Sequence, residues 1–287
     1  MTRFRKIGML AAAFASTLGS SSPVPADPLI ATTSPPGTPN CATPPALSAI
    51  DTVLDRAASR IAARQTLTVV AMGSSSTQGV GASSPAMSYP SRLEQKLRDR
   101  YPHNQIRVIN HGVGGQDVRE EVIRLDRDVI AEHPDLVIWQ VGTNAVLRRD
   151  DLSADEELIR RGVALMRENG IDVILMDLQY APRVVARPAA IEMERVIEQV
   201  AERAHVGLFR RFAIMREWNR THQLAPGEMI GLDGLHMTDT SYDCLANELA
   251  EALALNWGFH AKLAKSPNRS PDAIAGIELS AGPTGSR

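Results

Sequence analysis

Apolar positions in the central part of the chain follow two alternating patterns. Short continuous apolar runs, typical of strands buried on both faces of a sheet, occupy residues 67–72, 106–109, 136–141, 173–176 and 206–209. Between these runs, apolar residues recur every three or four positions, as they do on the buried face of an amphipathic helix. This alternation predicts a parallel β-sheet covered by helices on both faces.

The helical spacing predicts six helices around the sheet. The first is expected at residues 50–63, and the last contains Leu245, Leu249 and Leu253. Thr240 and Asp243 are spaced as a capping box for that last helix. The four helices between them are marked by Tyr89, Leu93 and Leu97; Val118, Val122, Leu125 and Val129; Ile159, Val163 and Met166; and Met193, Ile197 and Val200.

Both ends of the chain differ from this central part. Three basic residues precede an apolar stretch at 7–18, and Val24 and Ala26 suit a cleavage site, so residues 1–26 are predicted to be a signal peptide for export to the periplasm or beyond. A membrane-spanning helix needs about 20 apolar residues, so no membrane span is expected. Residues 27–46 are read as a Pro-rich flexible leader and 261–287 as a flexible tail. One folded domain, 47–260, remains.

Composition narrows the range of partners. With 44% hydrophobic residues the chain can bury a sizeable core, and its net charge of -2 gives no basic footprint for nucleic acid. A small or carbohydrate substrate is therefore expected. The protein is also expected to be a monomer. Cys41 and Cys244 are the two cysteines. They can form one disulfide in an oxidising compartment or remain two thiols, and spacing leaves both alternatives open.

Residues that follow the predicted strands are the candidates for chemistry, because ligands of such sheets bind at the carboxyl ends of the strands. Ser75 lies in the polar segment 73–79 after the first strand. A serine hydroxyl needs a neighbouring base to act as a nucleophile. Among the seven histidines, His236 stands out because Asp233 precedes it by three residues, a spacing that lets a carboxylate orient an imidazole. Each segment alone is also typical of an ordinary turn.

Acyl transfer further requires donors for the negative oxygen of the tetrahedral intermediate. Gly112, in the segment 110–115 after the second strand, could offer a backbone N–H, and Asn144, after the third strand, a side-chain amide. A metal site is not indicated, since neither an HExxH nor a CxxC pair is present.

Taken in order, four segments resemble the conserved blocks of the SGNH (GDSL-type) hydrolases: 73–75, 110–115, 142–144 and 233–236. The resemblance implies Ser75 as nucleophile, His236 as base and Asp233 as its orienting acid. It implies an oxyanion hole made by the Ser75 and Gly112 N–H groups and the Asn144 side chain. It also implies a flavodoxin-like three-layer α/β/α sandwich with a five-stranded parallel sheet, and neither cofactor nor metal.

The chain departs from the commonest form of these blocks. Ser74 and Ser76 flank the nucleophile where the family usually has Asp and Leu, and Ala145 stands where the third block usually ends in Asp. The catalytic groups are all retained. Ser74 and Ser76 nevertheless remain alternative nucleophiles, because three serines stand in a row.

The resemblance predicts an exported carboxylic ester hydrolase acting through an acyl-enzyme. An acyltransferase with the same triad and a non-catalytic carbohydrate-binding or interaction module are the alternatives. The absence of a long apolar insertion favours short acyl groups, including O-acetyl groups on carbohydrate. Tyr180 and Arg183, which follow the fourth predicted strand, are candidates for contact with the substrate. The alternative is that Tyr180 and Pro182 only close the rim of the site.

Overall fold

Residues 41–148 and 152–264 are described by the computed structural model, with side chains given as far as 258. The predicted signal peptide, residues 27–40 of the predicted leader and the tail beyond 264 lie outside the described residues.

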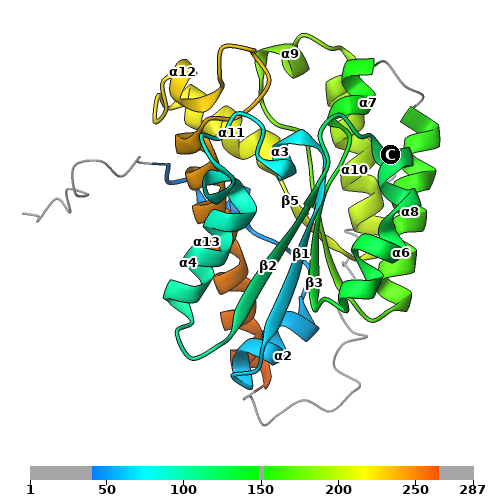
Figure 1. Cartoon of the computed structure of the whole chain (residues 1–287), viewed down its shortest axis with the longest axis vertical. Helices are drawn as coiled ribbons and strands as arrows, with labels where there is room; N and C mark the ends of the chain where they lie inside the picture. The colour runs from blue at the N-terminus through cyan, green and yellow to red at the C-terminus, as the bar shows by residue number, and fades with distance from the viewer. Residues whose placement is uncertain (1–40, 149–151, 265–287) are drawn as a thin grey trace, which may run out of the picture. The chain divides into compact units, whose positions relative to one another are not determined.

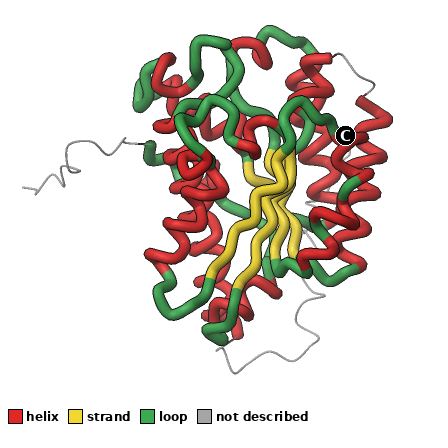
Figure 2. Tube along the Cα trace, viewed as in Figure 1, coloured by secondary structure: helices red, strands yellow, loops and turns green. Residues whose placement is uncertain are grey.

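A five-stranded parallel sheet forms the centre of the fold (Figure 2). The strands lie in the order β2-β1-β3-β4-β5, which is the flavodoxin-like order. From β1 the chain moves to one edge of the sheet, at β2, and from β3 it moves towards the other edge, at β5. Because the strand order reverses between β1 and β3, a crevice is expected beyond the carboxyl ends of these two strands. The predicted fold is confirmed. The strands are β1 (Leu67–Gly73), β2 (Ile106–Gly112), β3 (Leu136–Gln140), β4 (Asp172–Met176) and β5 (Gly207–Phe209).

Helices cover both faces of this sheet (Figure 1). On one face lie α2 (Asp55–Ala62), α4 (Tyr89–Arg100) and α13 (Asp239–Ala264). On the other lie α8 (Leu152–Glu168) and α10 (Ala189–Ala204), together with α5 (Val118–Ile123) and α6 (Leu125–Asp128). Because both faces are covered, the residues of β3 and most of those of β1 and β4 are buried, which explains their continuous apolar runs.

Several short elements at the edges of the sheet lack a pattern that would predict them. Four of them follow a strand, and all except α11 have too few residues for a helical period to appear. They are α1 (Pro45–Ser48), α3 (Ser75–Gln78), α7 (Thr143–Arg148), α9 (Pro182–Val185), α11 (Arg211–Arg220), α12 (Pro226–Met229) and the 3-10 turns Pro85–Met87 and Ile130–Glu132.

The first predicted helix, 50–63, begins five residues later than expected. Asn256 of α13 accounts for the difference: its Nδ2 donates to the carbonyl oxygens of Ile50 and Thr52, at 3.1 and 2.8 Å, and its Oδ1 accepts from the N–H of Leu54 at 3.3 Å. These side-chain bonds hold the segment before Asp55 in a non-helical conformation. A contact from the far end of the chain therefore overrides the local pattern.

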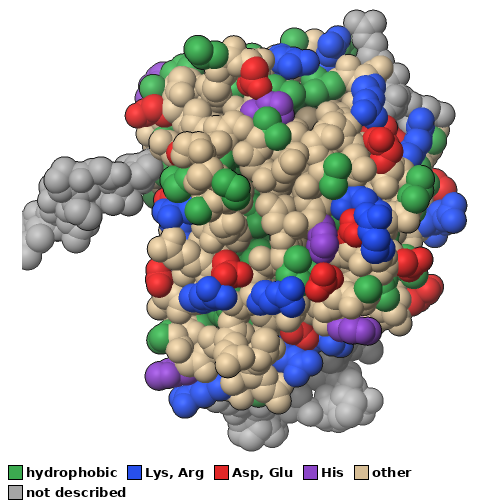
Figure 3. Space-filling model, in the orientation of Figure 1, with side chains coloured by type: hydrophobic (Ala, Val, Ile, Leu, Met, Phe, Trp, Pro, Cys, Tyr) green, Lys and Arg blue, Asp and Glu red, His purple; other side chains and the backbone are tan. Residues whose placement is uncertain are grey.

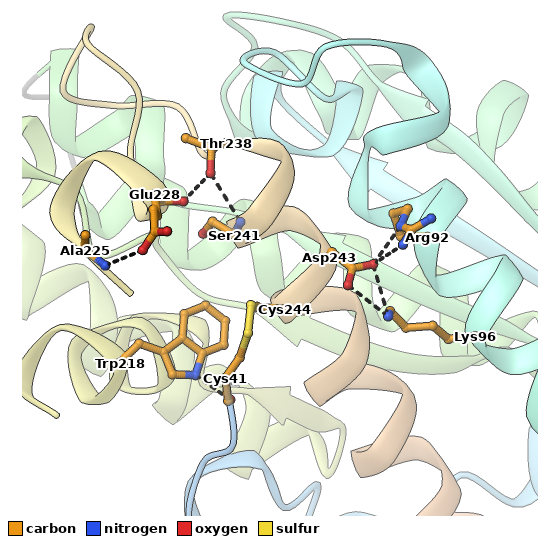
Figure 4. Close-up of a disulfide and its surroundings, with 10 residues drawn as sticks. All are labelled: Cys41, Arg92, Lys96, Trp218, Ala225, Glu228, Thr238, Ser241, Asp243 and Cys244. Carbon is orange, nitrogen blue, oxygen red and sulfur yellow. Dashed lines mark hydrogen bonds and ion pairs between the residues drawn. A yellow bond between two sulfur atoms is a disulfide. The ribbon is translucent and has the colours of Figure 1, made fainter. Parts of the chain in front are cut away.

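The last helix begins at Asp239, so the prediction that Thr240 and Asp243 form its capping box is wrong. Thr238 caps the helix instead, since its Oγ1 accepts from the N–H of Ser241 at 3.3 Å (Figure 4). Asp243 pairs with Arg92 and Lys96 of α4, so its carboxylate fastens α13 to the neighbouring helix.

The apolar spacing from 118 to 129 belongs to two helices rather than one. The break falls at Arg124, a buried residue between α5 and α6. Its guanidinium donates to the carbonyl oxygens of Gly73 and His111, at 3.0 and 2.8 Å, near the ends of β1 and β2. The helix is therefore interrupted at Arg124, whose side chain bonds to the ends of both strands next to the candidate site.

The folded unit begins earlier than the predicted boundary at residue 47. Cys41 and Cys244 are joined in a disulfide, with their Cα atoms 5.6 Å apart, and this decides between the two alternatives left by the sequence. The Nε1 of Trp218 also donates to the carbonyl oxygen of Cys41 at 2.8 Å (Figure 4). Residues 41–46 are therefore part of the folded unit. At the other end, α13 continues to Ala264, past the predicted start of the tail at 261.

Positive and negative side chains are interspersed on the face of the molecule shown in Figure 3. Within the described ranges, no helix combines the length and apolar character needed to cross a membrane. The same residues contain no group of three or more His, Cys, Asp or Glu side chains arranged to hold a metal ion.

Candidate active site

The turn after β1 places Ser75 at the first position of the short helix α3. Gly73 ends the strand with φ +155°, and a Cβ there would collide with the side chains of Thr77 and Gln140. A glycine is thus needed for the chain to turn this sharply. Ser75 is 9% exposed, so most of the residue is buried and a small part of its surface remains accessible. Its backbone N–H has no acceptor among the described residues.

Asp233 and His236 lie on a tight turn between α12 and α13. The bridge between Ile230 and Met237 closes the base of this turn, and the N–H of Gly231 donates to the carbonyl oxygen of His236 at 2.9 Å. Antiparallel pairing therefore fixes the backbone on both sides of the turn.

The three predicted catalytic side chains lie in contact. The Nε2 of His236 is 2.9 Å from the Oγ of Ser75, although 161 residues separate them in sequence. The Nδ1 of His236 is 2.5 Å from the Oδ2 of Asp233. In this arrangement the carboxylate can hold a proton on Nδ1, which leaves Nε2 free to accept the serine proton.

Asp233 is held in its ionised form. Partial burial opposes ionisation, but hydrogen bonds from the backbone N–H groups of His236 and Leu235 and from the His236 ring outweigh it and lower the pKa of Asp233 to about 2. The carboxylate is therefore charged throughout the neutral pH range. It can stabilise the positive charge that forms on His236 when the serine loses its proton.

Ser74 and Ser76, the alternative nucleophiles, turn away from His236. The Oγ atoms of both serines donate to the Oε1 of Gln140, at 2.9 and 3.1 Å, and both side chains are buried. Gln140 is the last residue of β3, so these hydroxyls face down into the end of the sheet. Ser75 alone of the three has its hydroxyl against the histidine.

Gly112 does not fit the role of oxyanion donor that the resemblance gave it. Its N–H donates to the Oδ1 of Asn110 at 2.9 Å and is therefore already occupied. A Cβ at Gly112 would collide with the backbone of Thr77 and Gln78, so this glycine is needed for two strand-end segments to pass closely. The prediction for Gly112 is corrected on these grounds.

Gly115 is the better placed glycine of the same segment. It has φ +82°, with open space where a Cβ would stand, and its N–H has no acceptor among the residues described. The neighbouring Gly114 N–H is taken by the Oε1 of Gln78 at 2.9 Å. Of the three glycines, Gly115 therefore has the N–H that remains free for a ligand.

Side chains of α7 hold the Gly115 segment in place. Asn144 donates one amide hydrogen to the carbonyl oxygen of Gln116 at 2.7 Å, and the second amide hydrogen is available to a ligand. One turn further along, Arg148 donates to the carbonyl oxygen of Gly115 and pairs with Asp117, each at 2.5 Å. The carbonyl oxygens of Gly115 and Gln116 are thus both bonded to α7, which holds the segment next to the free N–H of Gly115. Ala145, which replaces the usual Asp, is buried and makes no polar contact.

The two candidate substrate residues, Tyr180 and Arg183, make different contacts near the turn that carries Asp233 and His236, which is called the catalytic turn below. The backbone N–H of Arg183 donates to the carbonyl oxygen of Gly234 at 3.0 Å, and its aliphatic stem lies against that glycine. Tyr180 packs edge-on against Phe212, with ring centroids 5.3 Å apart. Tyr180 also lines a largely apolar hollow of about 420 Å³, together with Pro182, Val185, Ala186, Asn219, Pro226, Met229 and Ile230.

Comparison with known proteins supports the chemistry that this geometry suggests. The model of the Non-GDSL lipase-like family matches residues 40–256, which is most of the chain. The chain belongs to this family. The name of the family agrees with the replacement of Asp by Ser74 before the nucleophile, while the overall resemblance to SGNH-type hydrolases is confirmed.

Two relatives of this Non-GDSL lipase-like protein are esterases. An acetylxylan esterase from Geobacillus stearothermophilus is 31% identical over 47% of this chain and 72% of that protein. An arylesterase from Vibrio mimicus is 25% identical over 58% of this chain and 78% of that protein. The chain belongs among the carboxylic ester hydrolases.

Among solved structures, a two-domain esterase active on acetylated mannans matches with a TM-score of 0.62 and 19% identity. The match covers 74% of this chain and 56% of that protein. At this level of identity the match shows a shared fold. This Non-GDSL lipase-like chain spans just over half the length of the two-domain protein.

Sequence reasoning missed several residues that shape the site. Gly115 could not be distinguished from Gly112 and Gly114, because the spacing of three neighbouring glycines does not indicate which backbone N–H lacks an acceptor. Gln140 carried a weak signal, as a polar residue within an apolar run at the end of a strand. Arg148 gave none, since an arginine near the end of a helix is an ordinary surface residue.

Proposed function

We propose that this chain is an exported serine esterase that releases short acyl groups through an acyl-enzyme at Ser75. The observation that carries the proposal is the 2.9 Å contact between the Oγ of Ser75 and the Nε2 of His236, whose other ring nitrogen faces Asp233. A hydroxyl becomes an effective nucleophile when a base of this kind takes its proton. The esterase relatives support the same reaction class.

The reaction would proceed in two halves. The Oγ of Ser75 attacks the carbonyl carbon of the ester while the Nε2 of His236 accepts the serine proton. His236 then returns this proton to the departing alcohol, which leaves an acyl group on Ser75. A water molecule, deprotonated by His236, attacks the acyl carbon, and the acid departs as the proton returns to Ser75.

Three donors are proposed for the negative oxygen of the two tetrahedral intermediates. They are the backbone N–H groups of Ser75 and Gly115 and the second amide hydrogen of Asn144. Each is without a protein acceptor among the described residues. The three follow β1, β2 and β3, which are neighbours in the sheet, so their segments lie along one edge. Each such donor is worth about 3 kcal/mol of the barrier in related chemistry.

Acetyl esters of carbohydrate are the proposed substrates. The name of the acetylxylan esterase, the relative with 31% identity, supports acetyl removal from a sugar. The apolar hollow beside Tyr180 is proposed to receive part of the alcohol side of the ester, because Pro182 and Ile230 of its lining flank the segments that carry Arg183 and the catalytic turn. The basic and apolar N-terminal segment supports export.

The nucleophile is tested by the variants Ser75→Ala, Ser74→Ala and Ser76→Ala, assayed with a short chromogenic ester. Ser75→Ala should lower kcat about 10³-fold or more with the fold retained. A fluorophosphonate should label Ser75 alone, as peptide mass spectrometry can read. Near wild-type turnover in Ser75→Ala, or a label on Ser74 or Ser76, would refute the assignment.

The substrate is tested separately, with acyl chains of increasing length on one chromogenic alcohol and with acetylated xylooligosaccharides. We expect kcat/KM to fall as the chain lengthens beyond acetyl, and acetate to be released from the oligosaccharide. Adding an alcohol acceptor and analysing the products distinguishes hydrolysis from acyl transfer. A preference for long chains would contradict the proposed substrate while leaving the mechanism intact.

A further inference from the structure

A fully buried arginine lies beneath the turn that carries the nucleophile. Arg211 begins α11, the helix that follows β5 (Figure 1). Its Nη1 nevertheless donates to the Oγ of Ser76 at 2.9 Å. Its Nη2 donates to the carbonyl oxygen of Asp177 at 2.6 Å and to the Oε1 of Gln179 at 3.0 Å. The guanidinium therefore links the end of β4 to the turn after β1. The strand between them, β3, contributes Gln140.

Gln140 completes this support from below. Its Oε1 accepts from the backbone N–H of Ser74 at 3.1 Å, from the Oγ of Ser74 at 2.9 Å and from the Oγ of Ser76 at 3.1 Å. The residues on both sides of Ser75 are thus bonded to the same amide oxygen, and Arg211 supplies a further bond to Ser76. With its neighbours held downward, Ser75 is left facing His236.

Two carboxyl groups balance the buried charge. Burial raises the pKa of Asp177, and burial together with the adjacent Asp177 carboxyl raises the pKa of Glu194. Both carboxyl groups act on the charge of Arg211, which is itself fully buried. Buried ion pairs of this kind often add little to stability when compared with apolar residues of similar volume. Stability alone therefore gives a weak reason for placing an arginine here.

We propose that Arg211 is a positioning residue for the nucleophile, acting through Ser76 and Gln140 to keep the Ser75 hydroxyl aimed at His236. This inference rests on the proposed role of Ser75. Arginine suits the task because its planar guanidinium can bond to Ser76 and to the end of β4 at the same time, in fixed directions. A lysine ammonium is a single point donor and cannot reproduce this geometry.

The test uses Arg211→Lys, Ser76→Ala and the double variant, with Arg210→Lys as matched control. Arg210 faces outward to Asp51 and Glu198. All variants are assayed with a short chromogenic ester well below the lowest melting temperature of the set. Arg211→Lys should lower kcat about tenfold with KM within twofold, and the rate of fluorophosphonate labelling of Ser75 should fall in parallel. Arg210→Lys should leave all three unchanged.

The double variant separates positioning from general stability. If Arg211 acts through Ser76, adding Arg211→Lys to Ser76→Ala should cost much less kcat than it costs alone, because the link is already broken. Should Arg211→Lys fail to fold, Ser76→Ala alone decides, with an expected loss of about fivefold in kcat at constant KM. Single variants with kcat within twofold of wild type, or losses that simply multiply, would overturn the proposal. Failure of the triad itself would instead show as activity in Ser75→Ala.

Discussion

The carboxylate of Asp233 binds His236 at two places. Its Oδ1 accepts the backbone N–H of His236 at 3.0 Å and that of Leu235 at 2.9 Å, while its Oδ2 faces the His236 ring at 2.5 Å. The carboxylate therefore cannot rotate without losing two backbone hydrogen bonds. Its two oxygens have separate duties, one to the turn and one to the ring.

This division predicts an unusual order among Asp233 variants. In Asp233→Asn the amide oxygen should take the place of Oδ1, because two N–H groups require an acceptor there, and the NH₂ group must then face the Nδ1 of His236. The ring would be held with its proton on Nε2 and could not accept the serine proton. We expect kcat to fall about 10⁴-fold in Asp233→Asn. The fall should be smaller in Asp233→Ala, because the ring can then carry its proton on either nitrogen, and the tautomer with the proton on Nδ1 can still accept the serine proton.

The measurement is kcat for both variants at a neutral pH with a short chromogenic ester. Melting curves serve as the control, since Asp233→Ala loses the two backbone bonds and should be the less stable of the pair. Finding Asp233→Asn the more active variant would mean that the carboxylate does not select the tautomer.

Asn144→Ala tests the proposed oxyanion donor. The amide hydrogen that is free in the structure would act on the negative oxygen of the intermediate and hardly on the neutral ester. We expect kcat to fall about 10²- to 10³-fold while KM changes little. Asn169→Ala is the matched control, because Asn169 lies in the exposed turn after α8, where it donates to the carbonyl oxygen of Leu165, and α8 carries no part of the site. A loss that appears wholly in KM would exclude the proposed role.

Local sequence patterns predicted well wherever a single segment determines the outcome. The buried strands appear as continuous apolar runs, and Asp233 and His236 are close because they are only three positions apart. The segment 73–79 was a candidate because it follows a predicted strand, and the choice of Ser75 within it rested on the resemblance to the SGNH hydrolases.

What could not be predicted depends on contacts between distant segments. Gly112 and Gly115 look equivalent in the sequence, and only the bond from Gly112 to Asn110 shows that its N–H is occupied. The helix expected at 50–63 is shortened by Asn256, about 200 residues away. Arg211 meets Ser76 across 135 residues, a pairing that no local period encodes.

The disulfide between Cys41 and Cys244 should contribute strongly to stability, because it closes most of the described chain into a loop with a sequence separation of 203. In the chain-entropy account, removing a disulfide that closes a loop of this length lowers the free energy of unfolding by about 5 kcal/mol. We expect a double variant, Cys41→Ala with Cys244→Ala, to unfold at a much lower urea concentration. Reduced wild-type protein should approach the same midpoint. An unchanged midpoint would show that the segment around Cys41 is held by its other contacts alone.

Glu121 should make stability fall as pH rises. Burial, which outweighs the hydrogen bond from the Nε1 of Trp139 and the nearby charge of Arg124, raises its pKa to about 8. Between the ordinary pKa of about 4.3 and pH 8, the folded protein holds a proton that the unfolded chain has lost. The stabilising contribution is therefore complete below about pH 4 and is lost as pH rises through 8.

Glu121→Gln keeps an acceptor for Trp139 without this titration, so its advantage over wild type in urea unfolding should grow from pH 5 to pH 8. Glu157→Gln is the matched control of opposite sign, since a hydrogen bond from Arg160 lowers the pKa of exposed Glu157 and any effect should be confined to acid pH. Parallel stability curves for wild type and Glu121→Gln across this range would mean that Glu121 is ionised in the folded protein.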